Sequence, residues 1–207
     1  MSTQLHEALA RIGVRKAFPR GGVIVRQHEV AVSVLYVEQG ICRVAHLSAN
    51  GKESLLALRG VGELIGDFGV LAQRPRSAMV TAVTEMVCLV VPAEKFERLV
   101  ENEPSVSREV MRRLVLRVEQ ANTKRVDLGT LPTRQRLARL LLELITTYGN
   151  DVGSLLTQEE LGHAIGATRE SVVRALRGLR QDGVINTSRR ALVIRRPDLL
   201  AAECAGS

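Results

Sequence analysis

The sequence contains little cysteine and no spaced set of metal ligands. Its three cysteines, at positions 42, 88 and 204, form no C-x-x-C pair, and its four histidines show no ligand spacing. Three thiols cannot supply the four thiolates of an iron–sulfur cluster or a zinc ribbon, so we predict no metal site and no cofactor. A few unpaired cysteines are typical of a protein from a reducing cytosol.

Long apolar runs are absent too. No stretch of about 18 residues lacks a charge, and the N-terminal segment MSTQLHEALARIG has no apolar signal-peptide core, so we predict a cytoplasmic protein that does not enter a membrane. The sequence also lacks a P-loop, a nucleophile motif with a base, and a His/Glu cluster. We therefore predict no catalytic residue, and an enzyme on a cupin-type β-barrel is a poorly supported alternative.

Aromatic residues make up only 2% of the 207 residues, whereas basic residues are in excess. The formal net charge is +7 and the pI is near 10.0. Residues 1–104 carry 12 basic and 11 acidic side chains (+1), and residues 105–207 carry 17 and 11 (+6). An anionic partner should therefore bind the C-terminal half. Because few aromatic rings are available to stack on unpaired bases, double-stranded DNA is the expected partner.

Short apolar runs alternate with turn signals over residues 15–92. The runs lie at residues 23–25, 33–37, 42–47, 54–58 and 79–91. Among the turns between them, Asn50-Gly51 is the strongest hairpin signal, because this dipeptide tolerates the positive φ angles of a type I′ turn. Regularly spaced short strands predict a sandwich or a small barrel.

Helical periodicity follows. After Pro104, apolar residues spaced three and four apart predict one long helix, with a seam that pairs with a second copy of the chain. The seam residues are Met111, Leu114, Val118, Ala121 and Leu128. The alternative is a helix packed on its own domain. Residues 129–132 should interrupt this helix, and Thr133 should cap the next one. We expect three parts: a β-rich domain at 1–104, a dimerisation helix and hinge at 105–131, and a C-terminal domain at 132–207.

Residues 156–180 contain the most informative pattern. Thr157 and Glu160 have the spacing of a capping box, Gly166 suits the tight turn that ends this first helix, and Thr168 is positioned to cap a second helix. Two short helices joined by a glycine turn predict a helix-turn-helix. The alternative is a helical hairpin whose charges are merely solvated.

In a helix-turn-helix the second helix enters the major groove with its first turns. Arg169, Glu170 and Arg174 are exposed there; an arginine fork matches guanine O6 and N7, and a carboxylate accepts from the cytosine amino group. Other hydroxyl and basic side chains of the motif, and of a β-hairpin or wing over residues 184–194, are expected to contact phosphates. These are Thr157, Thr168, Ser171, Arg177, Arg180, Arg189 and Arg190.

The order of these elements resembles the Crp-Fnr superfamily of bacterial transcription regulators over essentially the whole chain. Residues 167–174 (ATRESVVR) are similar to the family's recognition helix, residues 66–68 with 76–78 to its phosphate-binding cassette, and residues 91–96 (VPAEKF) to its exit from the β-roll. The resemblance implies an α+β fold with an N-terminal β-roll (jelly roll) of the cyclic-nucleotide-binding type, a long dimerisation helix and a C-terminal winged helix-turn-helix.

The resemblance also implies a small effector in the β-roll, a cyclic nucleotide such as cAMP or cGMP. Arg76 and Ser77 are similar to the residues that hold the cyclic phosphate, a role that suits a guanidinium and a hydroxyl. Asp67 stands where the family favours a glutamate for the ribose 2′-hydroxyl, and residues 68–76 form a segment one residue shorter than in the founding member. The expected effector site comprises Gly66, Asp67, Phe68, Arg76 and Ser77, with Asn122 and Thr123 near the base.

The function implied by the resemblance is a homodimeric DNA-binding regulator paired through helix 105–128. Its two recognition helices would bind half-sites resembling TGTGA, about 10 base pairs apart, and RNA polymerase would be a further partner. An effector would shift the dimer helix and the hinge if it binds the two arrangements with different affinity. The alternative is a regulator that is ligand-independent or responds to another effector, with a vestigial nucleotide pocket; an empty or side-chain-filled pocket beside Arg76 would support it.

Overall fold

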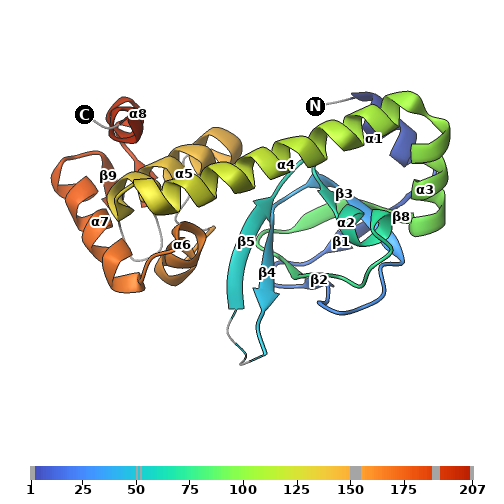
Figure 1. Ribbon diagram of the computed structural model, residues 1–207, viewed down its shortest axis with the longest axis horizontal. Coiled ribbons are helices and arrows are strands. Elements are labelled where there is room, and N and C mark those ends of the chain that lie inside the picture. Colours follow the sequence, from blue (N-terminus) through green and yellow to red (C-terminus); the bar gives the residue numbers. More distant parts are fainter. Residues whose placement is uncertain (1–2, 50, 52, 150–154, 188–191, 206–207) are drawn as a thin grey trace. The chain divides into compact units, whose positions relative to one another are not determined.

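The computed structural model describes residues 3–49, 51, 53–149, 155–187 and 192–205. The chain forms two compact units, residues 1–118 and 119–207, which meet within one long helix, α4 (Pro104–Thr130) (Figure 1). No described helix is long and apolar enough to cross a membrane.

The first unit contains two four-stranded sheets in which every pair of neighbours is antiparallel. Their strand orders are β1-β8-β3-β6 and β2-β7-β4-β5, so strands distant in sequence lie side by side. This arrangement is the predicted β-roll. The strands are β1 (Val14–Phe18), β2 (Val23–Val25), β3 (Ser33–Gln39), β4 (Cys42–Leu47), β5 (Glu53–Arg59), β6 (Leu64–Ile65), β7 (Met79–Ala82) and β8 (Met86–Pro92).

Strand β3 is buried on both faces. Since side chains alternate along a strand, Leu35 and Val37 join one apolar cluster with residues of both sheets, whereas Val34 and Tyr36 join another under the helices. That second cluster receives residues from α1 (Thr3–Ala10), α3 (Ala93–Asn102) and the first half of α4. The short helix α2 (Asp67–Leu71) follows β6 directly.

Helix α4 corrects the predicted seam at one position. Val106 and Val110 are buried in the β-roll core and Leu114 packs against it. Leu114 is therefore not on the exposed face, and the packed-helix alternative holds for the first half of α4. The exposed apolar side chains at this level are Met111, Val115, Leu116 and Val118.

The second unit is a helical bundle with a hairpin. Its elements after α4 are α5 (Thr133–Tyr148), α6 (Gln158–Ile165), α7 (Arg169–Gln181), β9 (Ile185–Thr187), β10 (Leu192–Ile194) and α8 (Pro197–Ala205). Leu137, Leu141, Val172, Leu179 and Leu200 are fully buried and form its centre.

The predicted break between α4 and α5 is present at Leu131 and Pro132 but is shorter than expected, and the predicted Thr133 cap is wrong. Helix α4 continues through Gly129 to Thr130, and α5 has Pro132 in the N-cap position with no side-chain cap, so Thr133 is its first residue and not its cap. The β9–β10 hairpin is the predicted wing, but its tip, with Arg189 and Arg190, lies outside the described residues.

Candidate functional site

A pocket of about 110 Å³ lies in the first unit beside α2. It contains five of the predicted effector residues, which come from two segments of the chain, 66–68 and 76–77. Its lining consists of Val25, Val44, Arg59, Leu64, Ile65, Gly66, Asp67, Phe68, Gly69, Arg76, Ser77, Ala78, Val80 and Arg117. A volume of this size is below the roughly 300–1,000 Å³ of most small-molecule sites.

Gly66 has a backbone conformation that permits the close approach of Arg76. Its φ of 80° lies in the left-handed region, and a Cβ added there would lie 2.0 Å from Arg76 Nη1. The Gly66 carbonyl accepts a hydrogen bond from that same Nη1 at 2.9 Å. Glycine is therefore needed at this position both for the turn into α2 and for the place of the guanidinium.

Arg76 is almost fully buried, with 6% of its surface exposed. Besides the bond to Gly66, its Nη2 donates to the Ser33 carbonyl oxygen at 2.5 Å. Burial lowers the pKa of Arg76, and the carboxylates of Glu29 and Asp67 oppose that shift. An arginine remains charged under such conditions, so the pocket contains a buried cation whose terminal nitrogens both bond to backbone carbonyls.

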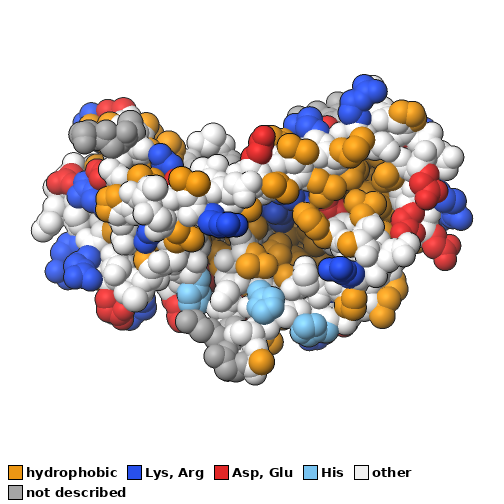
Figure 2. All heavy atoms as spheres, viewed as in Figure 1, with side chains coloured by type: hydrophobic (Ala, Val, Ile, Leu, Met, Phe, Trp, Pro, Cys, Tyr) orange, Lys and Arg blue, Asp and Glu red, His pale blue; other side chains and the backbone are white. Residues whose placement is uncertain are grey.

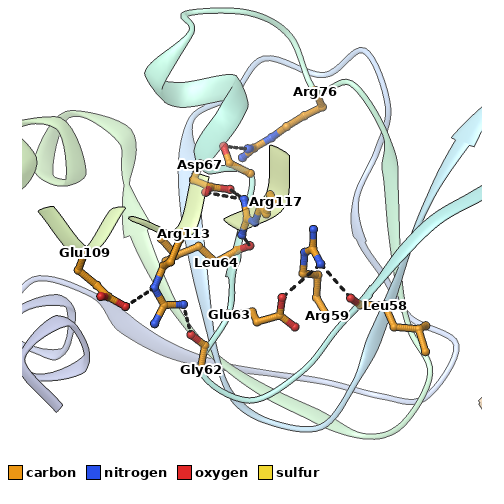
Figure 3. A network of polar contacts seen from close by, with 11 residues as sticks. Leu58, Arg59, Gly62, Glu63, Leu64, Asp67, Arg76, Glu109, Arg113 and Arg117 are labelled. Carbon is orange, nitrogen blue, oxygen red and sulfur yellow. Dashed lines mark hydrogen bonds and ion pairs between the residues drawn. The ribbon is translucent and has the colours of Figure 1, made fainter. Parts of the chain in front are cut away.

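Asp67 is also buried, and it forms an ion pair with Arg117 of α4 (Figure 3). Arg117 Nη1 lies 2.7 Å from Asp67 Oδ2, and Nη2 donates to the Leu64 carbonyl at 2.8 Å. The guanidinium also lies over the Phe68 ring, 5.6 Å from its centroid. The carboxylate predicted to meet a ribose hydroxyl therefore already has a charged partner inside the chain.

A second arginine, one helical turn earlier on α4, binds the turn that precedes β6. Arg113 Nη1 donates to the Gly62 carbonyl at 2.5 Å, and its Nε bonds to Glu109. Strand β6 is at the edge of its sheet, where carbonyls lack a neighbouring strand. Arg117 thus bonds to a carbonyl of the edge strand and Arg113 to a carbonyl of the preceding turn, and together they fix α4 to the β-roll next to the pocket.

Sequence analysis missed Arg117, Arg113 and Arg59 as residues near this site. Arg117 and Asp67 are 50 positions apart, and a local pattern carries no information about such a pair. Asn122 and Thr123, in contrast, do not line the pocket. Both are exposed, and the Thr123 hydroxyl donates to the Glu119 carbonyl within α4.

The helix-turn-helix is formed by α6 and α7. Thr157 and Glu160 make both bonds of the predicted capping box, at 3.2 and 2.7 Å. Gly166 ends α6 in the left-handed conformation, with φ 61°. The Thr168 hydroxyl caps α7 by accepting from Ser171 N at 3.2 Å. These cap and turn predictions are confirmed.

The apolar face of α7 is buried, and its charged residues lie on the outside. Val172, Ala175, Leu176 and Leu179 are buried, and Figure 2 shows basic side chains over α7. The exposed charged residues are Arg169, Glu170, Arg174, Arg177 and Arg180.

The surroundings of Glu170 and of the three hydroxyl side chains of the motif are also defined. The Glu170 backbone N–H, followed by the Thr168 hydroxyl, lowers the pKa of the Glu170 carboxyl, which therefore stays ionised and can only accept hydrogen bonds. Thr157 and Thr168 are exposed even though they cap helices, and Ser171 is half-buried. Among the described residues, no group of three or more His, Cys, Asp or Glu side chains is placed to hold a metal ion.

Comparison with known proteins gives the same two-part organisation. Residues 15–103 match the cyclic nucleotide-binding domain family, and residues 135–203 match the Crp-like helix-turn-helix domain family. The chain is 26% identical over 190 residues to the CRP-like cAMP-activated global transcriptional regulator of Mycobacterium tuberculosis, covering 89% of this chain and 85% of that one. It is 29% identical over 188 residues to the cyclic AMP receptor protein of Thermus thermophilus, covering 90% and 86%.

Solved structures share the fold. FixK2 from Bradyrhizobium japonicum superposes with a TM-score of 0.80 at 21% identity, covering 95% of this chain and 99% of that one. The c-di-GMP responsive regulator CLP from Xanthomonas campestris gives a TM-score of 0.74 at 20% identity, covering 93% and 99%.

Proposed function

Because the chain belongs to the Crp-Fnr superfamily of DNA-binding transcription regulators, we propose that it is a cytoplasmic, homodimeric regulator that binds a specific DNA sequence under the control of a cyclic nucleotide. The Mycobacterium tuberculosis relative is a transcriptional regulator and not an enzyme. The proposal concerns what the family alone leaves open: the bases contacted, the dimer and the effector.

The observation that carries the proposal is the exposed N-terminal half of α7. Arg169, Glu170 and Arg174 lie on its outer face, at the end that enters the major groove in a helix-turn-helix. We assign guanine to Arg169, cytosine to Glu170 and a bridging contact to Arg174, which corresponds to TGTGA-like half-sites. Thr157, Thr168, Ser171, Arg177 and Arg180, with Arg189 and Arg190 of the wing, are assigned to phosphates.

The dimer is proposed to form along α4. Met111, Val115 and Val118 are 57%, 56% and 55% exposed, which is unusual for apolar side chains spaced four and three apart on one helix. A second α4 would cover them as in a coiled coil. Two recognition helices related by a two-fold axis would then bind the two halves of a palindrome, where RNA polymerase is the expected further partner.

The effector is proposed to bind in the pocket beside α2. Arg76 supplies a cation and the exposed Ser77 a hydroxyl, which are the groups that a cyclic phosphate needs. Asp67 would accept from a ribose hydroxyl, and Arg117 links the same carboxylate to α4. A ligand whose ribose hydroxyl donates to Asp67 would therefore affect the dimer helix through Arg117. Asn122 and Thr123, which follow Arg117 along the same helix, remain the proposed contacts to the base.

A second candidate is a regulator that needs no ligand. Arg76 already donates to two carbonyls, Asp67 is paired with Arg117, and the remaining cavity is only about 110 Å³. In this case the Asp67–Arg117 pair would be a permanent structural link that holds α4 in one arrangement.

The deciding experiment is a titration of DNA affinity against nucleotide concentration. Fluorescence anisotropy with a labelled TGTGA palindrome is recorded with cAMP, with cGMP and with neither. Nucleotide-dependent tightening that Arg76→Ala abolishes supports control by a cyclic nucleotide. Equal affinity under all conditions, together with no binding heat in calorimetry, supports the ligand-independent candidate.

A further inference from the structure

Arg59 places a cation on a mostly aliphatic wall of the pocket. It is the last residue of β5, on the sheet opposite β6, and its side chain is 20% exposed. Among its neighbours in the pocket lining are the aliphatic residues Val44, Leu64 and Val80. A charged side chain in such a wall needs hydrogen-bond partners. The contacts of Arg59 show which of its guanidinium nitrogens have a partner within the chain.

Both contacts of the Arg59 guanidinium use the same nitrogen. Nη1 lies 3.2 Å from Glu63 Oε1 and donates to the Leu58 carbonyl at 3.2 Å. Within the described part of the chain, Nη2 and Nε of Arg59 have no hydrogen-bond partner, and neither atom is among the fully buried unsatisfied ones. These two N–H groups point in parallel along one edge of the guanidinium and form a free two-pronged donor.

The other two arginines of the pocket have both terminal nitrogens engaged. Arg76 bonds to Gly66 and Ser33, and Arg117 bonds to Asp67 and Leu64. In Figure 3 the Arg59 guanidinium points from β5 toward the space where Asp67 and Arg117 lie. Of the three, Arg59 alone offers a complete donor edge without first breaking a protein hydrogen bond.

Glu63 fixes the direction of that edge. Its Oε2 accepts from the Gly60 backbone N–H at 2.7 Å while Oε1 meets Arg59 Nη1. The carboxylate is therefore anchored to the loop between β5 and β6 and holds one side of the guanidinium. A preorganised fork loses less side-chain freedom on binding than a mobile one, so Glu63 is a positioning residue for Arg59.

The shape of this donor edge matches one kind of base. Guanine presents two acceptors, O6 and N7, along its Hoogsteen edge, whereas adenine presents the N7 acceptor beside the N6 amino donor. A donor pair facing adenine would leave one N–H opposed to another. The aliphatic walls suit a flat base, and the pocket has a single Arg76–Ser77 phosphate site, which suits a mononucleotide.

We infer that Arg59 makes this pocket selective for a guanine cyclic mononucleotide over an adenine one. The inference rests on the proposed function, since it requires a cyclic nucleotide to bind at Arg76. It goes beyond that function by assigning the base, and it differs from the cAMP named for the curated relatives.

The test is equilibrium binding to the full-length chain by isothermal calorimetry with four ligands. We expect cGMP to bind about ten- to a hundredfold more tightly than cAMP, the range typical of one bidentate arginine–guanine pair. Cyclic inosine monophosphate, which keeps O6 and N7 but lacks the 2-amino group, should bind like cGMP. The 7-deaza analogue of cGMP, which lacks the N7 acceptor, should lose most of the advantage.

Two variants and one control separate this role from a structural one. Arg59→Met should remove the preference for cGMP and leave cAMP affinity within about threefold, and Arg59→Lys, which keeps the charge without the fork, should do the same. Arg43→Met is the control, because Arg43 is a neighbouring arginine on β4 with its own carboxylate partner, Glu53, and does not line the pocket. It should leave both affinities unchanged. Thermal unfolding of each variant verifies that the unit is folded.

The outcomes distinguish the two proposals. If the wild type binds cyclic nucleotides with equal or greater affinity for cAMP, or if folded Arg59→Met weakens cGMP and cAMP alike, base selection by Arg59 is wrong while the proposed function stands. If the wild type binds no cyclic nucleotide, the proposed control by such a ligand fails and the inference fails with it.

Discussion

Arg117 of the long helix and Asp67 of the β-roll form a buried ion pair, with Nη1 2.7 Å from Oδ2 and side chains that are 14% and 3% exposed. The carboxylate lies in the pocket and the guanidinium lies on α4, so one contact joins the candidate effector site to the candidate dimer helix. A change in the hydrogen bonding of Asp67 therefore affects the position of Arg117 and of α4. The reason is that separating a buried ion pair costs several kcal/mol of free energy.

Breaking this pair should destabilise the first unit. Arg117→Met leaves the Asp67 carboxylate buried without its ion-pair partner, and we expect a loss of about 3–5 kcal/mol in the free energy of unfolding. Combining Asp67→Asn with Arg117→Met removes the unpaired buried carboxylate charge and should recover part of the lost free energy of unfolding. Urea unfolding of the two single variants and the double variant measures the coupling.

Arg112→Met is the control for Arg117→Met. Arg112 is also on α4 and pairs with Glu109, but its side chain is 58% exposed. Exposed pairs contribute roughly 0–1 kcal/mol. If Arg117→Met costs no more than Arg112→Met, the buried pair does not hold α4 on the β-roll.

Gly66→Ala should displace Arg76. The added Cβ would lie 2.0 Å from Arg76 Nη1, and the guanidinium can move away only by giving up its bond to the Gly66 carbonyl. Gly51→Ala is the matched control, since Gly51 has nearly the same φ, 79°, and no atom within 4 Å of the added Cβ. Both should lose about 1 kcal/mol for the left-handed backbone. Calorimetry should show that Gly66→Ala alone loses nucleotide binding, and equal binding by the two variants would contradict this.

The sequence was most informative where the determinants are local. Thr157, Glu160, Gly166 and Thr168 correctly predicted both ends of α6 and the start of α7, because each cap is set by residues three or four positions apart. The Asp67–Arg117 pair was not predictable in this way, since burial and a partner 50 positions away define it.

The seam of α4 shows a different limit. Both 111-114-118 and 111-115-118 satisfy a spacing of three and four, so periodicity alone does not choose between Leu114 and Val115. Packing against the β-roll core decides: Leu114 is in contact with it and Val115 is exposed. The packing of this helix on the β-roll of the same unit was needed to resolve the choice.

A charge on the exposed apolar face of α4, formed by Met111, Val115 and Val118, should prevent dimer formation. Val118 belongs to this face in both spacings, 111-114-118 and 111-115-118, and it is 55% exposed. Val118→Glu would bury two like charges at the proposed interface, and we expect at least a tenfold higher dimer dissociation constant by sedimentation equilibrium. Leu116→Glu is the control, because Leu116 is exposed and apolar but lies about 100° around the helix from Val115. A wild type that is monomeric at micromolar concentration would refute the dimer.

Stability of the first unit should fall in acid partly through Glu109. Hydrogen bonds from Arg112, and then from Arg113, lower the pKa of Glu109 below its ordinary value of 4.5. Since the folded pKa is the lower one, the stabilisation is complete above pH 4.5 and is lost as the pH falls through the folded value. Glu109→Gln should therefore be less stable than the wild type at pH 7, with the difference shrinking below pH 4.5. Urea midpoints between pH 3 and 7 measure this, with exposed Glu119→Gln as control.

Arg174→Ala should reduce sequence discrimination. Arg174 is exposed in the second turn of α7, where side chains meet base edges. We expect a loss of about 1–3 kcal/mol in the free energy of binding to the best palindrome and little change on random DNA, measured by anisotropy at fixed salt.

Arg180→Ala is the comparison, because Arg180 lies in the last turn of the same helix. As a phosphate contact it should weaken both DNAs alike and reduce the slope of log affinity against log salt by about 1. Equal losses on both DNAs for Arg174→Ala would assign Arg174 to a phosphate and leave the base contacts to Arg169 and Glu170.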